Sequence, residues 1–208
     1  VFNSIVPLAK LDPPPVGVGG GAPAHPAWST DGNKVAFSVR TNGNGLDFTA
    51  STLWVTDVDL MMPKFFNTKK IVDATVGRPT TTFPTFSPDS KQIAFERATQ
   101  ARTRGAAGEL FITDPDGESV ATLDNANGKG IISAPQAATS YEPTFMPVSV
   151  GGYNWLVFGS ERMYGNTLTS RNNSTDYNTC SRPQDNPKCR QKQLWVAAID
   201  LNPKPGED

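Results

Sequence analysis

The chain has 208 residues, and its 18 glycines, 18 prolines and short bursts of β-branched and aromatic residues are typical of many short strands joined by turns, not of a helix bundle. Lysine plus arginine (19) nearly balances aspartate plus glutamate (20), so the charge gives no electrostatic basis for binding nucleic acid. No stretch approaches the ~20 apolar residues of a transmembrane helix. No phosphate-binding loop, dinucleotide fingerprint or haem-attachment motif occurs, so we expect neither a membrane span nor a cofactor.

Residues 1–24 are predicted to be a linker. Residues 13–15 are three consecutive prolines and residues 19–21 are three consecutive glycines, which favours an irregular connection. Residues 2–11 are more apolar and are a candidate outer strand of a preceding unit of the repeat that follows.

Three imperfect copies of one repeat follow the linker. They share a Pro-x-aromatic start, a short apolar run that ends in phenylalanine, and a later leucine followed by aspartate six positions on. The equivalent prolines, phenylalanines and leucines are Pro26, Pro84 and Pro143; Phe37, Phe95 and Phe158; and Leu53, Leu110 and Leu194. The prolines are 58 and then 59 residues apart. We therefore predict three equivalent units at residues 25–78, 79–139 and 140–208.

In the second copy, local signals place the strands. The turn at residues 87–90 (Ser-Pro-Asp-Ser) separates a first strand from a buried strand at residues 93–95, and residues 110–112 form a third. Asp-Pro-Asp-Gly at residues 114–117 is a hairpin signal, and residues 119–123 are predicted to be a fourth, outer strand. Four antiparallel strands per copy are typical of a propeller blade. The sequence thus predicts an all-β chain of about three four-stranded blades, a partial β-propeller.

The third copy carries a long insertion at residues 160–192 between its second and third strands. Long loops between fixed strands usually carry function or are disordered. The insertion is therefore where we expect contact with a ligand or partner, and its two tyrosines are the better candidates. The candidate binding residues are Tyr164, Asn172, Tyr177, Arg182 and Arg190.

Cys180 and Cys189 are the only cysteines, and both lie in this insertion. A disulfide between them would close a small loop and would favour an oxidising compartment; the alternative is two unpaired thiols. No second cysteine or histidine pair completes a zinc ligand set, so we expect no metal.

The second copy resembles the repeat of TolB-type β-propellers. The resemblance rests on Pro-x-aromatic-Ser-Pro-Asp-Ser-Lys-x-Ile-Ala-Phe at residues 84–95 and Glu-Leu-Phe-Ile-Thr-Asp-Pro-Asp-Gly at residues 109–117. It covers residues 26–124 and, with the insertion, residues 142–201. This WD-like repeat occurs in bacterial periplasmic proteins and in the propeller domains of some serine peptidases. The resemblance implies a propeller fold and a periplasmic, cell-surface or secreted location.

Catalytic signals are missing from the sequence. No Gly-x-Ser-x-Gly motif occurs, and the only histidine, His25, lies where the first copy enters its first strand, so we expect it to pack or to form hydrogen bonds. The aspartates that follow the third strands, such as Asp59 and Asp114, are interpreted as turn caps rather than calcium ligands.

The favoured function is a non-catalytic, exported module that binds another protein. Two alternatives stay open: the propeller domain of a larger hydrolase or peptidase, and a carbohydrate or small-ligand binder that uses the inserted loop. Closed propellers usually have 4–8 blades, so we expect further blades to come from flanking sequence or another subunit.

Overall fold

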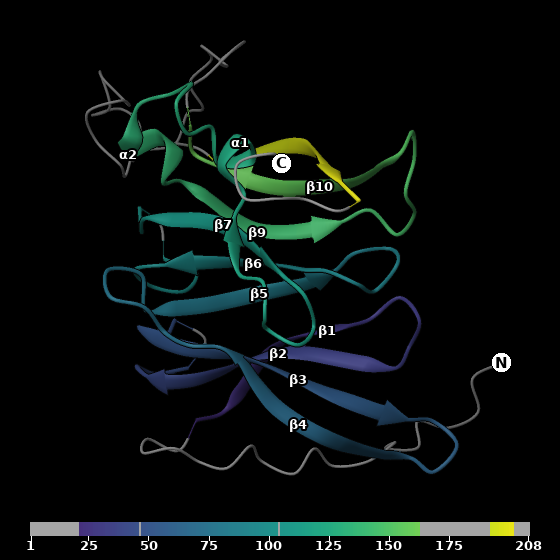
Figure 1. The fold of residues 1–208 in the computed structure, drawn as a ribbon. Helices are drawn as coiled ribbons and strands as arrows, with labels where there is room; N and C mark the ends of the chain where they lie inside the picture. The colour runs from purple at the N-terminus through teal and green to yellow at the C-terminus, as the bar shows by residue number, and fades with distance from the viewer. Residues whose placement is uncertain (1–20, 46, 104, 163–191, 202–208) are drawn as a thin grey trace, which may run out of the picture.

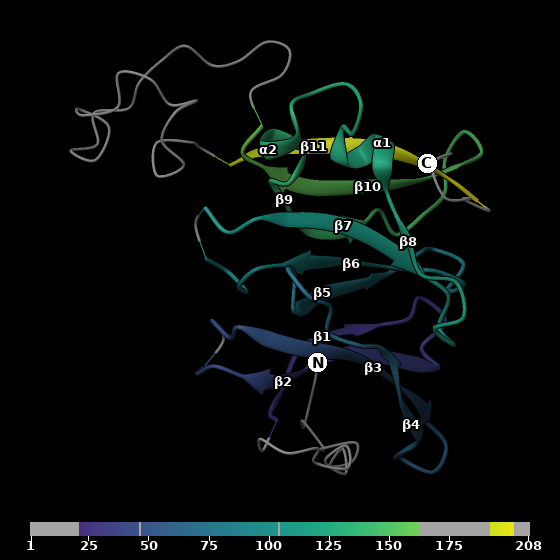
Figure 2. The same cartoon turned by 60° about the vertical axis from the view of Figure 1, so that its left-hand side comes forward.

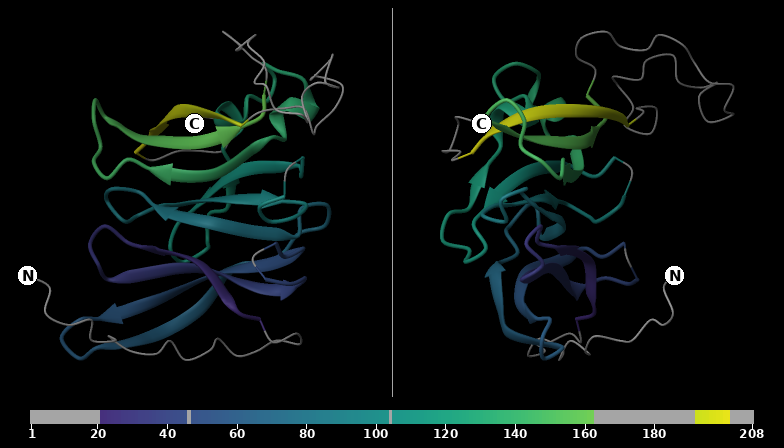
Figure 3. Two further views of the ribbon diagram at one scale, coloured as in Figure 1. Left: turned by 180° about the vertical axis from the view of Figure 1, so that it is seen from behind. Right: turned by 90° about the vertical axis from the view of Figure 1, so that its right-hand side faces the viewer.

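The computed structural model describes residues 21–45, 47–103, 105–162 and 192–201, and these residues form three antiparallel sheets that follow one another along the chain. The sheets lie face to face in a stack, with the N-terminal sheet at one end and the C-terminal sheet at the other (Figure 1, Figure 2). Views from behind and from the side show the same layers (Figure 3). The chain is therefore a partial β-propeller, as predicted, and we call the sheets blades 1, 2 and 3.

Within each blade the strands lie in sequence order. Blade 1 contains β1 (Pro23–Trp28), β2 (Lys34–Asn42), β3 (Ala50–Asp59) and β4 (Lys64–Val72). Blade 2 contains β5 (Thr80–Phe86), β6 (Ile93–Ala98), β7 (Gly108–Thr113) and β8 (Ala121–Thr122). Blade 3 contains β9 (Ser140–Phe145), β10 (Tyr153–Ser160) and β11 (Gln193–Asp200). Two short helices, α1 (Asp124–Asn127) and α2 (Ala134–Ala137), connect blade 2 to blade 3.

The strand register confirms that the three copies are structurally equivalent. The repeat phenylalanine of each second strand lies opposite an aromatic residue of the third strand, and it is at most 2% exposed in every blade. The three pairs are Phe37 with Trp54, Phe95 with Phe111, and Phe158 with Trp195. Since the same pair recurs at the same register, each copy is one unit of the stack and not merely a similar stretch of sequence.

The first strand of every blade contains the same strained bulge. The residue before the repeat proline has a left-handed φ of 50° at His25, 50° at Phe83 and 53° at Glu142, and the strand register shifts there. A positive φ is uncommon outside glycine, and a following proline restricts that residue further. The strain is therefore a property of the repeat, stored at one equivalent position per blade.

The predicted Ser-x-Asp turns are present in the first two blades. Ser29 Oγ donates to Asp31 and Ser87 Oγ donates to Asp89, each at 2.6 Å. The two turns also contact each other, because Thr30 Oγ1 donates to the Ser87 carbonyl at 3.2 Å. Blade 3 uses a different connection at residues 146–152, yet its β9 and β10 still pair.

Two predictions for the outer strands need correction. Of the predicted strand at residues 119–123, only Ala121–Thr122 is strand, and the helices α1 and α2 were not expected. The Asn127 side chain of α1 accepts from the Leu110 backbone N–H at 2.9 Å and donates to the Leu110 carbonyl at 3.0 Å. The Asn127 side chain thus forms with β7 the kind of hydrogen bonds that the backbone of a longer β8 would form. Within the described residues blade 3 has three strands, so four strands are confirmed for blades 1 and 2 alone.

The core consists of three clusters of buried apolar side chains; one, with Val35 and Phe37, lies on the outer face of blade 1, and the other two lie between the blades. Of these two, one joins blades 1 and 2 and the other joins blades 2 and 3. In the first, Leu53 and Val55 pack with Phe86, Ile93 and Phe95. Blade 2 contributes to both clusters, so stacking buries both of its apolar faces and the faces of blades 1 and 3 that contact it.

Candidate functional site

The outward face of blade 3 is the largest departure from this pattern of burial. In a strand, successive side chains point to opposite faces. On β10, Leu156 and Phe158 point inward to blade 2, whereas Val157 points outward. On β11, Leu194 and Val196 also point outward and are 81% and 59% exposed. We call the surface formed by these outward residues and their neighbours the open face; its members are Tyr153, Trp155, Val157, Leu194, Val196 and Ala198.

Positions equivalent to the open face are buried in the other blades. Leu194 is equivalent to Leu53 and Leu110, which are both 0% exposed. Val196 is equivalent to Val55 and Ile112, which are 1% and 5% exposed. In blades 1 and 2 these side chains form the surface on which the next blade packs. Blade 3 therefore has the same kind of face as the one on which the next blade packs in blades 1 and 2. No described residue covers this face of blade 3 to the same degree.

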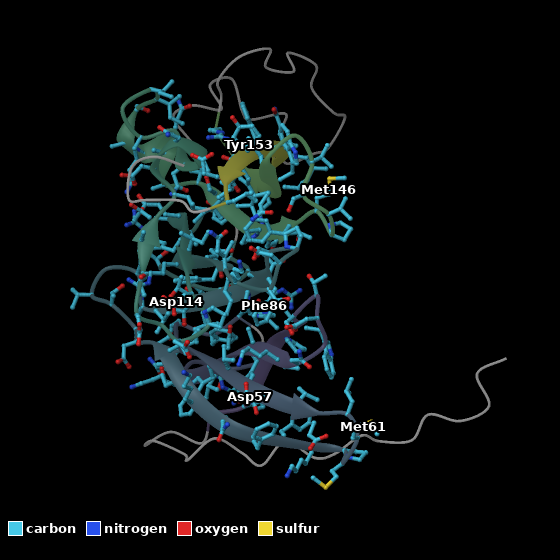
Figure 4. All side chains as sticks on the ribbon, turned by 45° about the vertical axis from the view of Figure 1, so that its right-hand side comes forward. Asp57, Met61, Phe86, Asp114, Met146 and Tyr153 are labelled. Carbon is cyan, nitrogen blue, oxygen red and sulfur yellow. The ribbon has the colours of Figure 1, made fainter. Side chains whose placement is uncertain are left out.

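Aromatic side chains border the open face. Tyr153 is 41% exposed and packs edge-on against Trp155, with 6.3 Å between ring centroids. The Trp155 indole N–H donates to the Val150 carbonyl at 2.9 Å, which fixes the ring over the surface. Tyr153 lies on the end blade, away from Phe86 in the middle of the stack (Figure 4). The open face thus combines exposed apolar side chains with a tyrosine and a tryptophan.

A buried arginine holds the inner side of β11 in place. Arg162 is 7% exposed, its guanidinium lies 4.0 Å from the centroid of Trp195, and its Nη1 donates to the Ala126 carbonyl at 2.8 Å. Burial lowers the pKa of Arg162 to about 10, so the group stays cationic at neutral pH. This contact ties β11 to α1.

A second candidate lies where the first strands of the blades meet. His25 stacks on Phe83, with ring centroids 4.0 Å apart, and lies 5.6 Å from Phe48. Neither ring nitrogen of His25 has a hydrogen-bond partner among the described residues. Burial and nearby Arg102 lower the pKa of His25, while Glu142 opposes the change. The packing role predicted for His25 is confirmed, and the hydrogen-bonding role is not seen.

Between blades 2 and 3 this edge contains a buried carboxyl group. Glu96 is 2% exposed, and its Oε2 accepts a hydrogen bond from the Glu142 backbone N–H at 2.9 Å. Burial raises the pKa of Glu96 to about 7. The Glu142 carboxylate pairs with Lys192 at 3.3 Å, and the ammonium lies 4.6 Å from the centroid of Tyr141. Glu96 could not be singled out from the repeat, because the equivalent positions, Ser38 and Gly159, are not acidic.

The residues predicted to bind a ligand lie outside the described residues, and so do both cysteines. Tyr164, Asn172, Tyr177, Arg182, Arg190, Cys180 and Cys189 therefore stay predictions. The turn-capping role of the aspartates is confirmed: Asp59 accepts from the backbone N–H groups of Met61 and Met62, both at 2.9 Å. Met61 lies at the hairpin end of blade 1 (Figure 4). Among the described residues, no group of three histidine, cysteine, aspartate or glutamate side chains is placed to hold a metal.

The repeat alignment contains a signal for the open face. Leu194 and Val196 are apolar at positions that the first two copies reserve for contact with the next copy. The repeat alignment therefore places Leu194 and Val196 on the kind of face that packs against a neighbouring blade in blades 1 and 2.

No family model matches the sequence, and no curated protein matches it. Similar solved structures include TolB from Acinetobacter baumannii, with a TM-score of 0.36 and 20% identity over 68% of this chain and 27% of TolB. They also include Pyrococcus horikoshii acylaminoacyl peptidase, with a TM-score of 0.44 and 16% identity over 90% of this chain and 24% of the peptidase. The α-L-arabinofuranosidase from Lactobacillus brevis has a TM-score of 0.41 and 9% identity over 95% of this chain and 60% of that enzyme.

This chain spans between about a quarter and three-fifths of the length of those proteins. At these identities and TM-scores, the similarities assign neither a family nor an activity to the chain. Its fold class rests on its own sheets, which form a stack of propeller blades. No helix in the described part of the chain is long and apolar enough to cross a membrane.

Proposed function

We propose that this chain is a non-catalytic propeller module that binds another protein through the open face of blade 3. The observation that carries the proposal is the exposure of Leu194 (81%) and Val196 (59%) at positions where the other blades bury apolar residues almost completely. Contiguous exposed apolar surface is uncommon on monomeric proteins and marks interaction sites. Covering these side chains would remove apolar surface from water, and the same hydrophobic effect holds the three blades together.

Aromatic anchors support a protein as the partner. Tyrosine and tryptophan are enriched among the residues that dominate binding energy at protein interfaces. Tyr153 and Trp155 border the apolar strip and are held by each other and by the Val150 carbonyl. Because they are ordered before binding, little side-chain entropy is lost when a partner covers them.

The proposal includes export of the parent protein from a bacterial cell. It rests on the two cysteines and on the resemblance of residues 84–95 to TolB-type repeats. Non-reduced peptide mapping of the protein from its native cells tests it. A disulfide-linked peptide pair containing Cys180 and Cys189 is expected, and free thiols at both positions would contradict export.

Site-specific photo-crosslinking tests the binding role. A photoreactive amino acid replaces Val196 on the open face or, as the matched control, Asp89 in the exposed turn of blade 2. In cells that make the protein, position 196 should give a covalent adduct with another protein and position 89 should not. No adduct from position 196, or the same adducts from both positions, would contradict the proposal.

A further inference from the structure

We propose that Asn44 is a site of spontaneous deamidation, at which the side-chain amide is lost as ammonia and an aspartate or isoaspartate forms. Three asparagines of the sequence precede a glycine: Asn42, Asn44 and Asn127. Glycine favours the reaction because it has no side chain to shield its backbone nitrogen. The three sites share this sequence but differ in their surroundings, so the structure decides which of them reacts.

The reaction needs only the two adjacent residues and water. The Gly45 backbone nitrogen attacks the side-chain carbonyl carbon of Asn44, and a carbon–nitrogen bond forms while the bond to the amide nitrogen breaks. The amide leaves as ammonia with the proton of the Gly45 N–H, and a cyclic imide remains. Water then adds to one of the two imide carbonyl groups. Opening on the side-chain side gives aspartate, and opening on the backbone side gives isoaspartate; no atom is oxidised or reduced.

Asn44 lies where this attack meets no obstacle. Its side chain is exposed, and no hydrogen bond among the described residues holds the Asn44 amide or the Gly45 N–H. A Cβ atom at Gly45 would meet nothing within 4 Å beyond its chain neighbours. The Arg40 guanidinium donates to the Gly45 carbonyl at 3.2 Å, and a cation so close favours loss of the proton from the attacking nitrogen. The site thus has both the space and the charge that ring closure requires.

Hydrogen bonds hold Asn127 against the same reaction. Its side chain is 0% exposed and is bonded to both the N–H and the carbonyl of Leu110. The Gly128 N–H already donates to the Asn125 carbonyl at 2.8 Å. A Cβ atom at Gly128 would lie 3.0 Å from the Ile132 side chain, so the site is also closely packed. Asn127 can therefore react only when this part of blade 2 opens.

Asn42 is the intermediate case. Its side chain is exposed, but Asn42 is the last residue of β2, and its carbonyl accepts from the Thr49 N–H at 3.1 Å. A Cβ atom at Gly43 would lie 2.7 Å from the Thr49 nitrogen and 2.8 Å from the Phe48 Cα. Ring closure requires the Asn42 backbone to rotate out of the extended conformation of a strand, and these contacts oppose that rotation.

Conversion of Asn44 changes the charge of the loop between β2 and β3. One neutral amide becomes one carboxylate, which takes the formal net charge of the chain from −1 to −2. The new carboxylate forms near the Arg40 guanidinium, in the loop whose Phe48 carbonyl accepts from the Ala101 N–H of blade 2 at 3.0 Å. The modified chain is therefore more acidic than the unmodified chain, and ion exchange separates the two.

Peptide mapping by mass spectrometry tests the proposal. The full chain is incubated at neutral pH, and conversion of each asparagine is followed over time, with the same chain in guanidinium chloride as the matched control. In the folded chain, Asn44 should convert about tenfold or more faster than Asn127, because Asn127 must wait for local opening. In guanidinium chloride the three rates should become similar. Asn44→Gln should remove the main acidic species, because the longer side chain would have to close a larger ring.

Equal conversion of Asn44 and Asn127 in the folded chain would overturn the proposal, since the structure would then not select the site. An Asn44 that stays intact in the folded chain while it reacts in guanidinium chloride would overturn it as well. Persistence of the main acidic species in Asn44→Gln would place the modification at another residue and would have the same consequence.

Discussion

Blades 2 and 3 present the same repeat in two different surroundings. Leu110 and Ile112 of blade 2 are 0% and 5% exposed, whereas the equivalent Leu194 and Val196 of blade 3 are 81% and 59% exposed. The residue types hardly differ; what differs is that blade 2 has a neighbour on each side. At this pair of repeat positions, burial follows the presence of a next blade in the stack. Four predictions test this comparison.

The largest effect is expected from truncating the buried leucine. Leu110→Ala should lower the free energy of unfolding by about 2–5 kcal/mol, because it leaves a cavity between blades 2 and 3. Leu194→Ala, the same change at the equivalent exposed position, should cost no more than about 0.5 kcal/mol. Denaturant titration measures both. Equal losses of unfolding free energy would mean that Leu110 and Leu194 are buried to the same degree.

The pH dependence of stability should come largely from Glu96, which blade 3 covers. Its pKa is about 7 in the folded protein against an ordinary value of 4.5, so the folded state keeps a proton that the unfolded state loses between these values. The free energy of unfolding should therefore fall as the pH rises from 4.5 to 7, by about 3 kcal/mol. Glu96→Gln should remove this fall. A variant that keeps the wild-type pH profile would show that the carboxyl group is not buried as described.

A smaller effect is expected where blade 3 approaches blade 2 most closely. A Cβ atom at Gly108 would lie 2.8 Å from the Tyr141 ring and 2.9 Å from the Ser140 carbonyl oxygen. Gly108→Ala should therefore cost about 1–3 kcal/mol through overpacking. Lys192→Ala, at the equivalent position of blade 3, loses only a half-exposed ion pair and should cost at most about 1 kcal/mol. Thermal unfolding compares the stability of the two variants. A larger loss of stability for Lys192→Ala would contradict the claim that position 108 is the more tightly packed of the two.

The smallest effect is expected at the turns that join blades 1 and 2. Thr30→Val removes the hydroxyl that donates to the Ser87 carbonyl at a part-buried site and should cost about 0.5–1 kcal/mol. Thr30→Ser keeps the hydroxyl and serves as the control. Indistinguishable midpoints for the valine and serine variants in denaturant titration would show that this contact does not stabilise the stack.

Much of the fold was predictable because the repeat encodes it. Spacing placed Phe37, Phe95 and Phe158 at equivalent positions, and the register confirms it. The connection after β8 was not predictable, since the pairing of the Asn127 side chain with Leu110 depends on a contact that no local pattern encodes. The burial of Glu96 was also hidden, because it is created by blade 3 and not by the neighbours of Glu96 in sequence.

The candidate site could be predicted only in part from the sequence. The sequence directed attention to the insertion at residues 160–192, because long loops often carry function. The residues predicted there stay untested, whereas the open face lies on regular strands, where Leu194 and Val196 look like ordinary core residues. The structure distinguishes them from the equivalent Leu110 and Ile112, which pack against blade 3, whereas no described residue covers Leu194 and Val196 to the same degree.

Residue-level oxidative footprinting of the intact chain tests the central claim most directly, because hydroxyl radicals modify side chains in proportion to their exposure. Leu194 and Val196 should be oxidised about tenfold faster than the chemically matched Leu110 and Ile112, as expected for exposed against buried side chains. Similar oxidation rates for the two pairs would contradict the account, since the end blade would then be as well covered as the middle one.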